Sequence, residues 1–272
     1  MSITRIASQQ SAFQSASNIG GAGNRVASSS LTLSTGQRIN SAGDDPAGFS
    51  LANTLSARGG GLTQSIANIG NATNALNIAE SGLVAITDLT LQISERAVQA
   101  ADGALSDDQR TAIQGEIDAL VAEIDDIARE TSFQDQSLID GTFTDRSVQT
   151  GPDSGDTFNL SIGNGTAAAL GLDDIDVTTQ AGASAAIDQA AQAQTEVTAA
   201  VQEVGQSQTQ LRAREDNLVA TALNNEAVRS RVEDADVAEE LLNRTRNQIL
   251  LQASIAAAAQ GNASAQEVLD LF

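Results

Sequence analysis

The sequence predicts a mainly α-helical, elongated protein whose long helices pack through coiled-coil seams. Apolar residues recur every three or four positions over long stretches, which is the spacing of one helix face. Aromatic residues make up 2% of the chain, so its apolar residues are mostly small or aliphatic and suit narrow seams between helices. Glycine-rich, alternating sequence is confined to residues 133–180, where we expect a small β-hairpin region.

Composition excludes several classes of site. The chain of 272 residues has no cysteine and no histidine, which rules out disulfides, imidazole or thiolate metal ligands and Ser-His nucleophile pairs. Its net charge of −21, with arginine as the only cation, repels nucleic acid and anionic membranes. No apolar run has the signal-peptide pattern or the length of about 20 residues that a membrane span needs. We therefore expect no catalytic residue, metal or cofactor, no signal peptide and no membrane insertion.

The first predicted helix covers residues 3–33 and is weak by itself. Three glycines near its middle each cost about 1 kcal/mol of helix propensity relative to alanine. Larger apolar residues recur at seven-residue intervals, the spacing of a seam that faces a partner helix. We expect this helix to order only when packed. The predicted seam residues are Ile6, Phe13, Ile19, Val26 and Leu33.

Residues 33–48 combine a helix stop with a helix start. Gly36 can adopt the left-handed conformation that ends a helix, and Asp45 before Pro46 has the pattern of an N-cap followed by proline at the first helical position. No acidic residue precedes Asp44. We interpret the stretch as a hinge between two helices. The predicted hinge residues are Gly36, Arg38, Asn40, Asp44, Asp45 and Pro46.

A long amphipathic helix is expected after this hinge. Residues 46–57 have a helical pattern that the run Arg58-Gly59-Gly60-Gly61 is expected to interrupt. From Leu62 a seven-residue ladder continues to about Gly103, with support from Ile66, Ile86 and Ile93. The ladder residues are Leu62, Ile69, Leu76, Leu83, Thr90 and Ala97.

The next helix begins with a capping box formed by Ser106 and Gln109. Spacings of four and three residues predict its buried stripe, and the carboxylates beside that stripe are interpreted as a solvated face. The stripe residues are Ile113, Ile117, Leu120, Ile124 and Ile127.

Residues 133–180 are interpreted as one or two surface hairpins. The run 157–162 alternates polar and apolar residues, Pro152-Asp153 has a turn pattern, and Asn164-Gly165 suits a tight hairpin turn. No regular nonapeptide repeat supports calcium binding. Asn164-Gly165-Thr166 also matches the acceptor sequence for N-glycosylation, but so short a pattern often arises by chance.

The last third of the chain is expected to be helical again. From Ala183 a rhythm of three and four residues continues past Ala222, which with the preceding helices predicts an antiparallel bundle. The final segment, residues 231–272, carries Leu242, Ile249, Ala256 and Ala263 at seven-residue intervals and is the expected partner of the first helix. No charged residue lies between residues 247 and 266. Such a surface can be buried between identical copies without the desolvation of ions.

Two stretches closely resemble the signatures of the bacterial flagellins. Residues 33–48, Leu-Ser-Thr-Gly-Gln-Arg-Ile-Asn-Ser-Ala-Gly-Asp-Asp-Pro-Ala-Gly, are similar to the N-terminal signature, and residues 230–236 with 248–253 are similar to the C-terminal one. The resemblance implies an inner coiled-coil domain made of 1–43 and 231–272. It also implies an outer helical domain made of 44–182, with its hairpin region, and the return helix 183–230. Further outer domains are not expected, because only about 50 residues separate the second helix of the bundle from the return helix.

The resemblance also implies a function, partners and a location. Flagellins are structural subunits that polymerise into the extracellular filament used for swimming, and they are exported unfolded through the flagellum's own type III channel. The expected partners are further copies of the chain, the flagellar cap, the hook-filament junction protein and an export chaperone. The alternative is that the chain is itself a hook-filament junction protein. An enzyme is not expected, because flagellins that resemble metalloproteases carry an inserted histidine motif that is absent here.

One departure from the family concerns recognition by hosts. In many flagellins, the segment resembling residues 92–99 binds the mammalian Toll-like flagellin receptor through arginine close to glutamate. Glu95 is present, but Gln92 and Ser94 stand where arginines are usual, and Arg96 stands where leucine is usual. We expect weak binding to that receptor.

Overall fold

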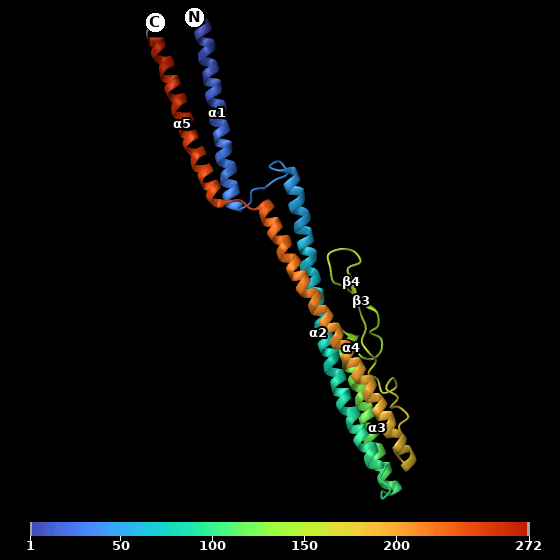
Figure 1. The fold of residues 1–272 in the computed structure, drawn as a ribbon. Helices are drawn as coiled ribbons and strands as arrows, with labels where there is room; N and C mark the ends of the chain where they lie inside the picture. The colour runs from blue at the N-terminus through green and yellow to red at the C-terminus, as the bar shows by residue number, and fades with distance from the viewer. Residues whose placement is uncertain (1, 271–272) are drawn as a thin grey trace. The chain divides into compact units, whose positions relative to one another are not determined.

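The computed structural model describes residues 2–270, and in 2–9, 11, 262 and 264–270 it describes the backbone alone. Five helices and four short strands occur in this part of the chain (Figure 1). It divides into two compact units: unit 1 combines Met1–Arg58 with Asn224–Phe272, and unit 2 is Gly59–Leu223. The helices are α1 (Ser2–Thr35), α2 (Pro46–Ala100), α3 (Asp107–Glu130), α4 (Gln180–Glu233) and α5 (Val237–Asp270).

The core of unit 2 lies between α2, α3 and α4. All six residues of the predicted ladder on α2 are buried, and so are three of the five stripe residues predicted on α3; Leu120 and Ile127 are partly buried. Helix α4 adds a parallel row of small and branched side chains, including Ala190, Val197 and Val204. Seven-residue spacing therefore correctly predicted which face of each helix is buried.

The predicted interruption of α2 at residues 58–61 is wrong, because the helix is continuous from Pro46 to Ala100. Each glycine weakens the helix by about 1 kcal/mol, but Leu62 is buried directly after them, which returns roughly 1.5–3 kcal/mol. Gly61 also has a packing role: an added Cβ would lie 3.0 Å from the Cβ of Pro152. Tertiary packing has overridden local propensity here.

Two antiparallel hairpins follow α3, as the sequence allowed. Strands β1 (Ser132–Phe133) and β2 (Gln136–Ser137) form the first, and β3 (Arg146–Gln149) and β4 (Thr157–Leu160) form the second. The predicted Pro152-Asp153 turn lies in the loop between β3 and β4.

The hairpin turn predicted at Asn164-Gly165 is wrong. These residues follow β4 without joining it to another strand. Instead, the Asn164 side chain closes a local turn, in which its Oδ1 accepts hydrogen bonds from the N–H (3.0 Å) and Oγ1 (2.9 Å) of Thr166. An asparagine before glycine suits both kinds of turn, so the dipeptide alone could not distinguish them.

The same turn is built twice more in this region with aspartate. Asp140 Oδ1 accepts from the N–H (2.9 Å) and Oγ1 (2.7 Å) of Thr142, and Asp176 Oδ1 accepts from the N–H (2.8 Å) and Oγ1 (2.6 Å) of Thr178. The threonine hydroxyls lower the pKa of both carboxyl groups, because they donate to the charged form. Three Asp/Asn-x-Thr turns therefore shape the connection from α3 to α4.

A buried arginine closes the C-terminal end of α2. Arg110, which is 5% exposed, donates from Nε to Ala100 O (3.0 Å), from Nη1 to Leu105 O (2.8 Å) and from Nη2 to Asp102 O (2.7 Å). The carbonyls at a helix end lack partners within the helix, and this guanidinium supplies them. The capping box of Ser106 and Gln109 starts α3 as predicted. Arg110 itself was not foreseen.

No helix in the described part of the chain has the length and apolar character needed to cross a membrane.

Candidate assembly surface and hinge in unit 1

Helices α1 and α5 lie side by side in unit 1, as the sequence predicted (Figure 1). The side of α1 against α5 carries mostly small or medium side chains, with Ala22 and Ser29 fully buried. The corresponding row on α5 is largely polar or small. Its partly buried residues are Glu240, Asn243, Arg244, Asn247, Leu251, Ser254 and Ala258.

Apart from the partly buried Leu251, the larger apolar side chains described on α5 lie away from this contact. Leu242 is 68% exposed and Ile249 is 60% exposed. On α1, Phe13 is 83% exposed. We call five exposed large apolar residues of α5 the outer face; they are Leu241, Leu242, Ile249, Leu250 and Ile255.

The predicted seam is therefore only partly a contact within one chain. Ile19, Val26 and Leu33 are partly buried on the α5 side of α1, and Ile6 is outside the described side chains. The prediction was wrong for the α5 residues as partners of α1, because Leu242, Ile249, Ala256 and Ala263 are all exposed. Phe13 is likewise exposed. Seven-residue spacing identifies an apolar stripe, but it does not distinguish a stripe covered by the same chain from one left open.

The two connections that leave the α1–α5 pair are joined by backbone hydrogen bonds. Gly36, with φ +73°, ends α1 in the left-handed conformation, as predicted. Its carbonyl accepts from Ala235 N (2.9 Å), Gln37 forms an antiparallel bridge with Asp234, and Arg38 N donates to Glu233 O (2.6 Å). We call the paired segments 36–38 and 232–235 the latch.

Side chains reinforce the latch. Arg38 Nη2 donates to Val232 O (2.5 Å), and Gln37 Nε2 donates to Glu233 Oε1 (2.7 Å). The other carboxylate oxygen of Glu233 pairs with Arg229 (2.8 Å), which also pairs with Glu226. The hydrogen bond from Arg229 lowers the pKa of Glu226 and raises the pKa of Arg229. Glu233 thus connects the end of α4 to the start of the segment after α1.

The remaining predicted hinge residues shape the path into α2. Asp44 Oδ2 accepts from Asn40 N (3.0 Å), Ser41 N (2.8 Å) and Ser41 Oγ (3.0 Å), and these bonds, led by the Ser41 hydroxyl, lower its pKa. Asp45 caps α2 by accepting from Gly48 N (3.0 Å), with Pro46 as the first helical residue. All six predicted hinge residues lie in this connection or at its ends.

The segment expected to meet an immune receptor lies on α2 in unit 2. Gln92, Glu95 and Arg96 are exposed and Ser94 is partly exposed. Arg96 is engaged, because its Nε pairs with Glu116 of α3 at 3.0 Å and its Nη1 donates to Gln99 Oε1 at 3.0 Å.

Comparison with known families identifies the family to which this chain belongs. Residues 6–144 match the bacterial flagellin N-terminal helical region, and residues 185–272 match the bacterial flagellin C-terminal helical region. The chain belongs to the bacterial flagellin family. Flagellins are the structural subunits of the flagellar filament, and this chain is one of them.

Curated relatives of this flagellin agree in length and name. The flagellar filament 33 kDa core protein of Treponema phagedenis is 32% identical over 256 residues, which cover 88% of this chain and 90% of that protein. The flagellin of Halalkalibacterium halodurans is 32% identical over 242 residues, covering 88% of this chain and 89% of that protein.

A solved structure shares the fold. The putative flagellar hook-associated protein of Vibrio parahaemolyticus superposes with a TM-score of 0.58 at 19% identity, covering 70% of this chain and 99% of that protein. At this identity the likeness concerns the fold alone. It gives no preference for the hook-junction alternative over the filament subunit.

Proposed function

We propose that this flagellin polymerises through the outer face of unit 1, and that the latch is the hinge of the assembling ends. The observation that carries the proposal is the exposure of Leu242 and Ile249, two large apolar side chains on a helix with no charged residue between 247 and 266. Covering this surface with further copies gains about 25 cal/mol per Å² of apolar area, and its charge-free part, which contains Ile249, Leu250 and Ile255, can be covered without desolvating ions.

The weak core of unit 1 supports coupled ordering and assembly. Of the hydrophobic side chains described there, only Ala22, Ile39 and Ala52 are buried. Glycines 20, 21 and 23 of α1 add no packing, since an added Cβ at any of them would meet nothing within 4 Å. The terminal helices therefore gain most of their stabilisation from neighbouring copies, which keeps the subunit assembly-incompetent until it reaches the growing end.

Seeded polymerisation tests this proposal. Purified subunit is mixed with short filament seeds and followed by negative-stain electron microscopy, alongside a deletion of residues 1–40, a Leu242→Ser, Ile249→Ser double variant and a Gln252→Ser control. Gln252 is exposed on the same helix but polar. We expect long filaments from the parent and the control, and none from the deletion or the double variant.

The same images distinguish a filament subunit from the alternative, a hook-filament junction protein. Growth of the double variant at the parent's rate would refute assembly through the outer face. Closed rings in place of filaments, or subunits that never elongate even from seeds, would favour the hook-filament junction protein.

The filament's other partners follow from the same role. Assembly outside the cell requires export through the flagellar type III channel, addition beneath the cap and a first contact with the hook-filament junction protein. The exposed outer face of α5 is the surface that an export chaperone would have to cover before assembly, because five of the exposed large apolar side chains of unit 1 lie on this one helix.

Weak recognition by the Toll-like flagellin receptor is part of the proposal. Gln92 and Ser94 offer no cation, and the guanidinium of Arg96 is already paired with Glu116. Receptor activation by depolymerised parent protein is compared with that by a Gln92→Arg, Ser94→Arg variant. We expect stronger activation by the variant; strong activation by the parent would contradict this.

A further inference from the structure

The chain contains five Asn-x-Ser/Thr acceptor sequences, and the fold presents them very differently. An acceptor amide in a folded protein is reached most easily where the backbone is neither helical nor paired in a sheet. Four of the five lie within regular structure, in α2, β4 or α5, and the fifth lies in the loop after β4. In order, the acceptor asparagines are Asn71, Asn159, Asn164, Asn243 and Asn262.

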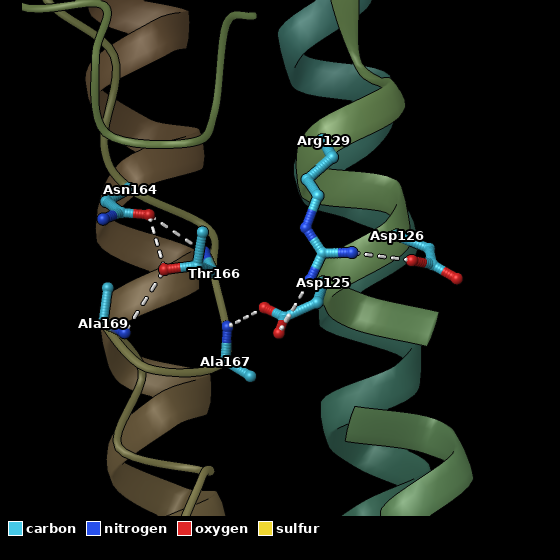
Figure 2. Close-up of polar contacts among 7 residues, drawn as sticks. All are labelled: Asp125, Asp126, Arg129, Asn164, Thr166, Ala167 and Ala169. Carbon is cyan, nitrogen blue, oxygen red and sulfur yellow. Dashed lines mark hydrogen bonds and ion pairs between the residues drawn. The ribbon is translucent and has the colours of Figure 1, made fainter. Parts of the chain in front are cut away.

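Asn164, the acceptor in the loop, is exposed and its amide nitrogen is uncommitted. The Oδ1 atom faces Thr166, whereas Nδ2 points away from it (Figure 2). Nδ2 donates no hydrogen bond to any residue in the described part of the chain. Gly141, at φ +87°, lies close to this amide: an added Cβ there would be 2.5 Å from Nδ2, so only glycine leaves room for the Asn164 side chain.

Hydrogen bonds to other parts of unit 2 hold the backbone around Thr166 in place. Gly165 N donates to Ile139 O (2.8 Å). Figure 2 shows the second bond, in which Ala167 N donates to Asp125 Oδ1 (2.9 Å) of α3. Asp125 is itself held by Arg129 at 3.4 Å. These bonds hold the backbone on both sides of Thr166 against the body of unit 2, so the Asn164 side chain is presented in a defined position.

The two sister turns show that the fold does not require an amide at position 164. Asp140 and Asp176 close the same Asp/Asn-x-Thr turn with a carboxylate oxygen in place of the amide oxygen. The turn uses Oδ1 alone, so the NH2 group of Asn164 is chemically free for another use.

We propose that Asn164 is a site of N-linked glycosylation. The donor class is a sugar activated at its anomeric carbon by a diphosphate. In the transfer, a bond forms between Nδ2 and that carbon, and the bond from the carbon to the phosphate oxygen breaks. The diphosphate leaves with the electron pair, and one amide proton passes to a base of the transferase. This modification goes beyond filament formation and does not depend on it.

Mass spectrometry of filaments sheared from the source cells tests the proposal. Trypsin cleavage after Arg146 and Arg212 releases residues 147–212, which contain Asn164 and Asn159 as their two acceptor residues. Fragmentation that retains the sugar assigns the modified residue. We expect the added mass on Asn164 and none on Asn159, whose backbone is paired with Ser147 in the hairpin.

Chromosomal variants complete the test. Asn164→Asp keeps the turn that Asp140 and Asp176 already form and removes the acceptor amide, so the added mass should disappear while filaments still form. Asn159→Asp is the matched control and should leave it unchanged. Thr166→Ser preserves the Asn-x-Ser/Thr acceptor sequence, so this variant should retain the added mass. An unmodified Asn164 in native filaments, or a sugar on a hydroxyl residue of the same peptide, would overturn the proposal.

Discussion

The two units of this flagellin differ in charge and in where they place apolar residues. Unit 2 contains 25 acidic residues and six arginines, a net charge of −19, whereas unit 1 contains ten acidic residues and eight arginines, a net charge of −2. Unit 2 holds nearly all of the fully buried hydrophobic side chains that the structure describes. Both units expose some large hydrophobic side chains, but unit 1 has few buried ones beside the exposed ones of α5.

The difference separates folding from assembly within one chain. Unit 2 completes its core internally and carries charge outside, which is the arrangement of a soluble domain. Unit 1 is nearly neutral and leaves its apolar surface open, and in the proposed function other copies complete its burial. The following predictions test this division.

The largest contrast is expected between core and outer-face truncations of the same residue type. Leu76→Ala, in the core of unit 2, should lower the free energy of unfolding of the subunit by about 2–5 kcal/mol. Leu242→Ala should change it by less than about 0.5 kcal/mol, because Leu242 is exposed in the subunit. Urea unfolding of unpolymerised protein, followed by far-UV circular dichroism, measures both. Equal losses would show that unit 1 has an internal core of its own.

Removing the buried arginine of unit 2 should have the next largest effect. Arg110→Met leaves the carbonyls of Ala100, Asp102 and Leu105 without their donor, and a buried group without a partner costs about 1–3 kcal/mol. Arg212→Met, at an exposed position of α4, is the matched control and should cost less than about 0.5 kcal/mol. The same urea titration compares them. A loss of similar size in both variants would mean that net charge, not the helix-end bonds, is responsible.

The charge of unit 2 should make filament growth depend on salt. Raising the ionic strength from about 10 mM to about 150 mM shortens the screening length from about 30 Å to about 8 Å, which weakens repulsion between subunits. We expect faster elongation from seeds, measured by light scattering. An Asp173→Asn, Asp174→Asn variant, altered at two exposed acidic positions, should depend less on salt. Slower growth of the parent at the higher salt would contradict this account.

The smallest expected effect is the contribution of the hinge residue Asp44 to filament stability at low pH. Because hydrogen bonds lower the folded-state pKa of Asp44, its carboxylate stabilises the folded connection above the unfolded pKa of about 4. This contribution is lost as the pH falls through the lowered folded value. The temperature at which filaments dissociate, measured between about pH 6 and pH 2, should therefore fall less steeply for Asp44→Asn. Identical pH profiles for parent and variant would show that Asp44 does not contribute to filament stability.

Sequence periodicity correctly predicted the helix faces that are buried by contacts within one chain. The ladder from Leu62 to Ala97 is buried as expected, since a seven-residue apolar repeat identifies the buried face of a long helix. The capping box at Ser106 and the left-handed end at Gly36 were also identified, because each needs only local sequence.

The errors have a common physical origin in long-range packing. The glycines at 59–61 looked like a break because local propensity contains no term for Pro152 or for the buried Leu62. The partners of Leu242 and Ile249 were misplaced because spacing does not specify which chain covers a stripe. The role of Glu233 could be found only once helix ends distant in sequence were brought together. Arg110 bonds carbonyls five to ten residues before it, so an arginine one turn into a helix that follows a short connection is a local sign of its role.

The latch has a mechanical consequence. The chain leaves the α1–α5 pair through two segments, 36–38 and 232–235, and hydrogen bonds join these segments to each other. A pulling force applied to the end of either helix is therefore shared by both segments of the latch. One segment can extend without the other only after the hydrogen bonds between them have broken. Tensile strength at this point is a property of the pair, which suits a filament that is rotated under load for its working life.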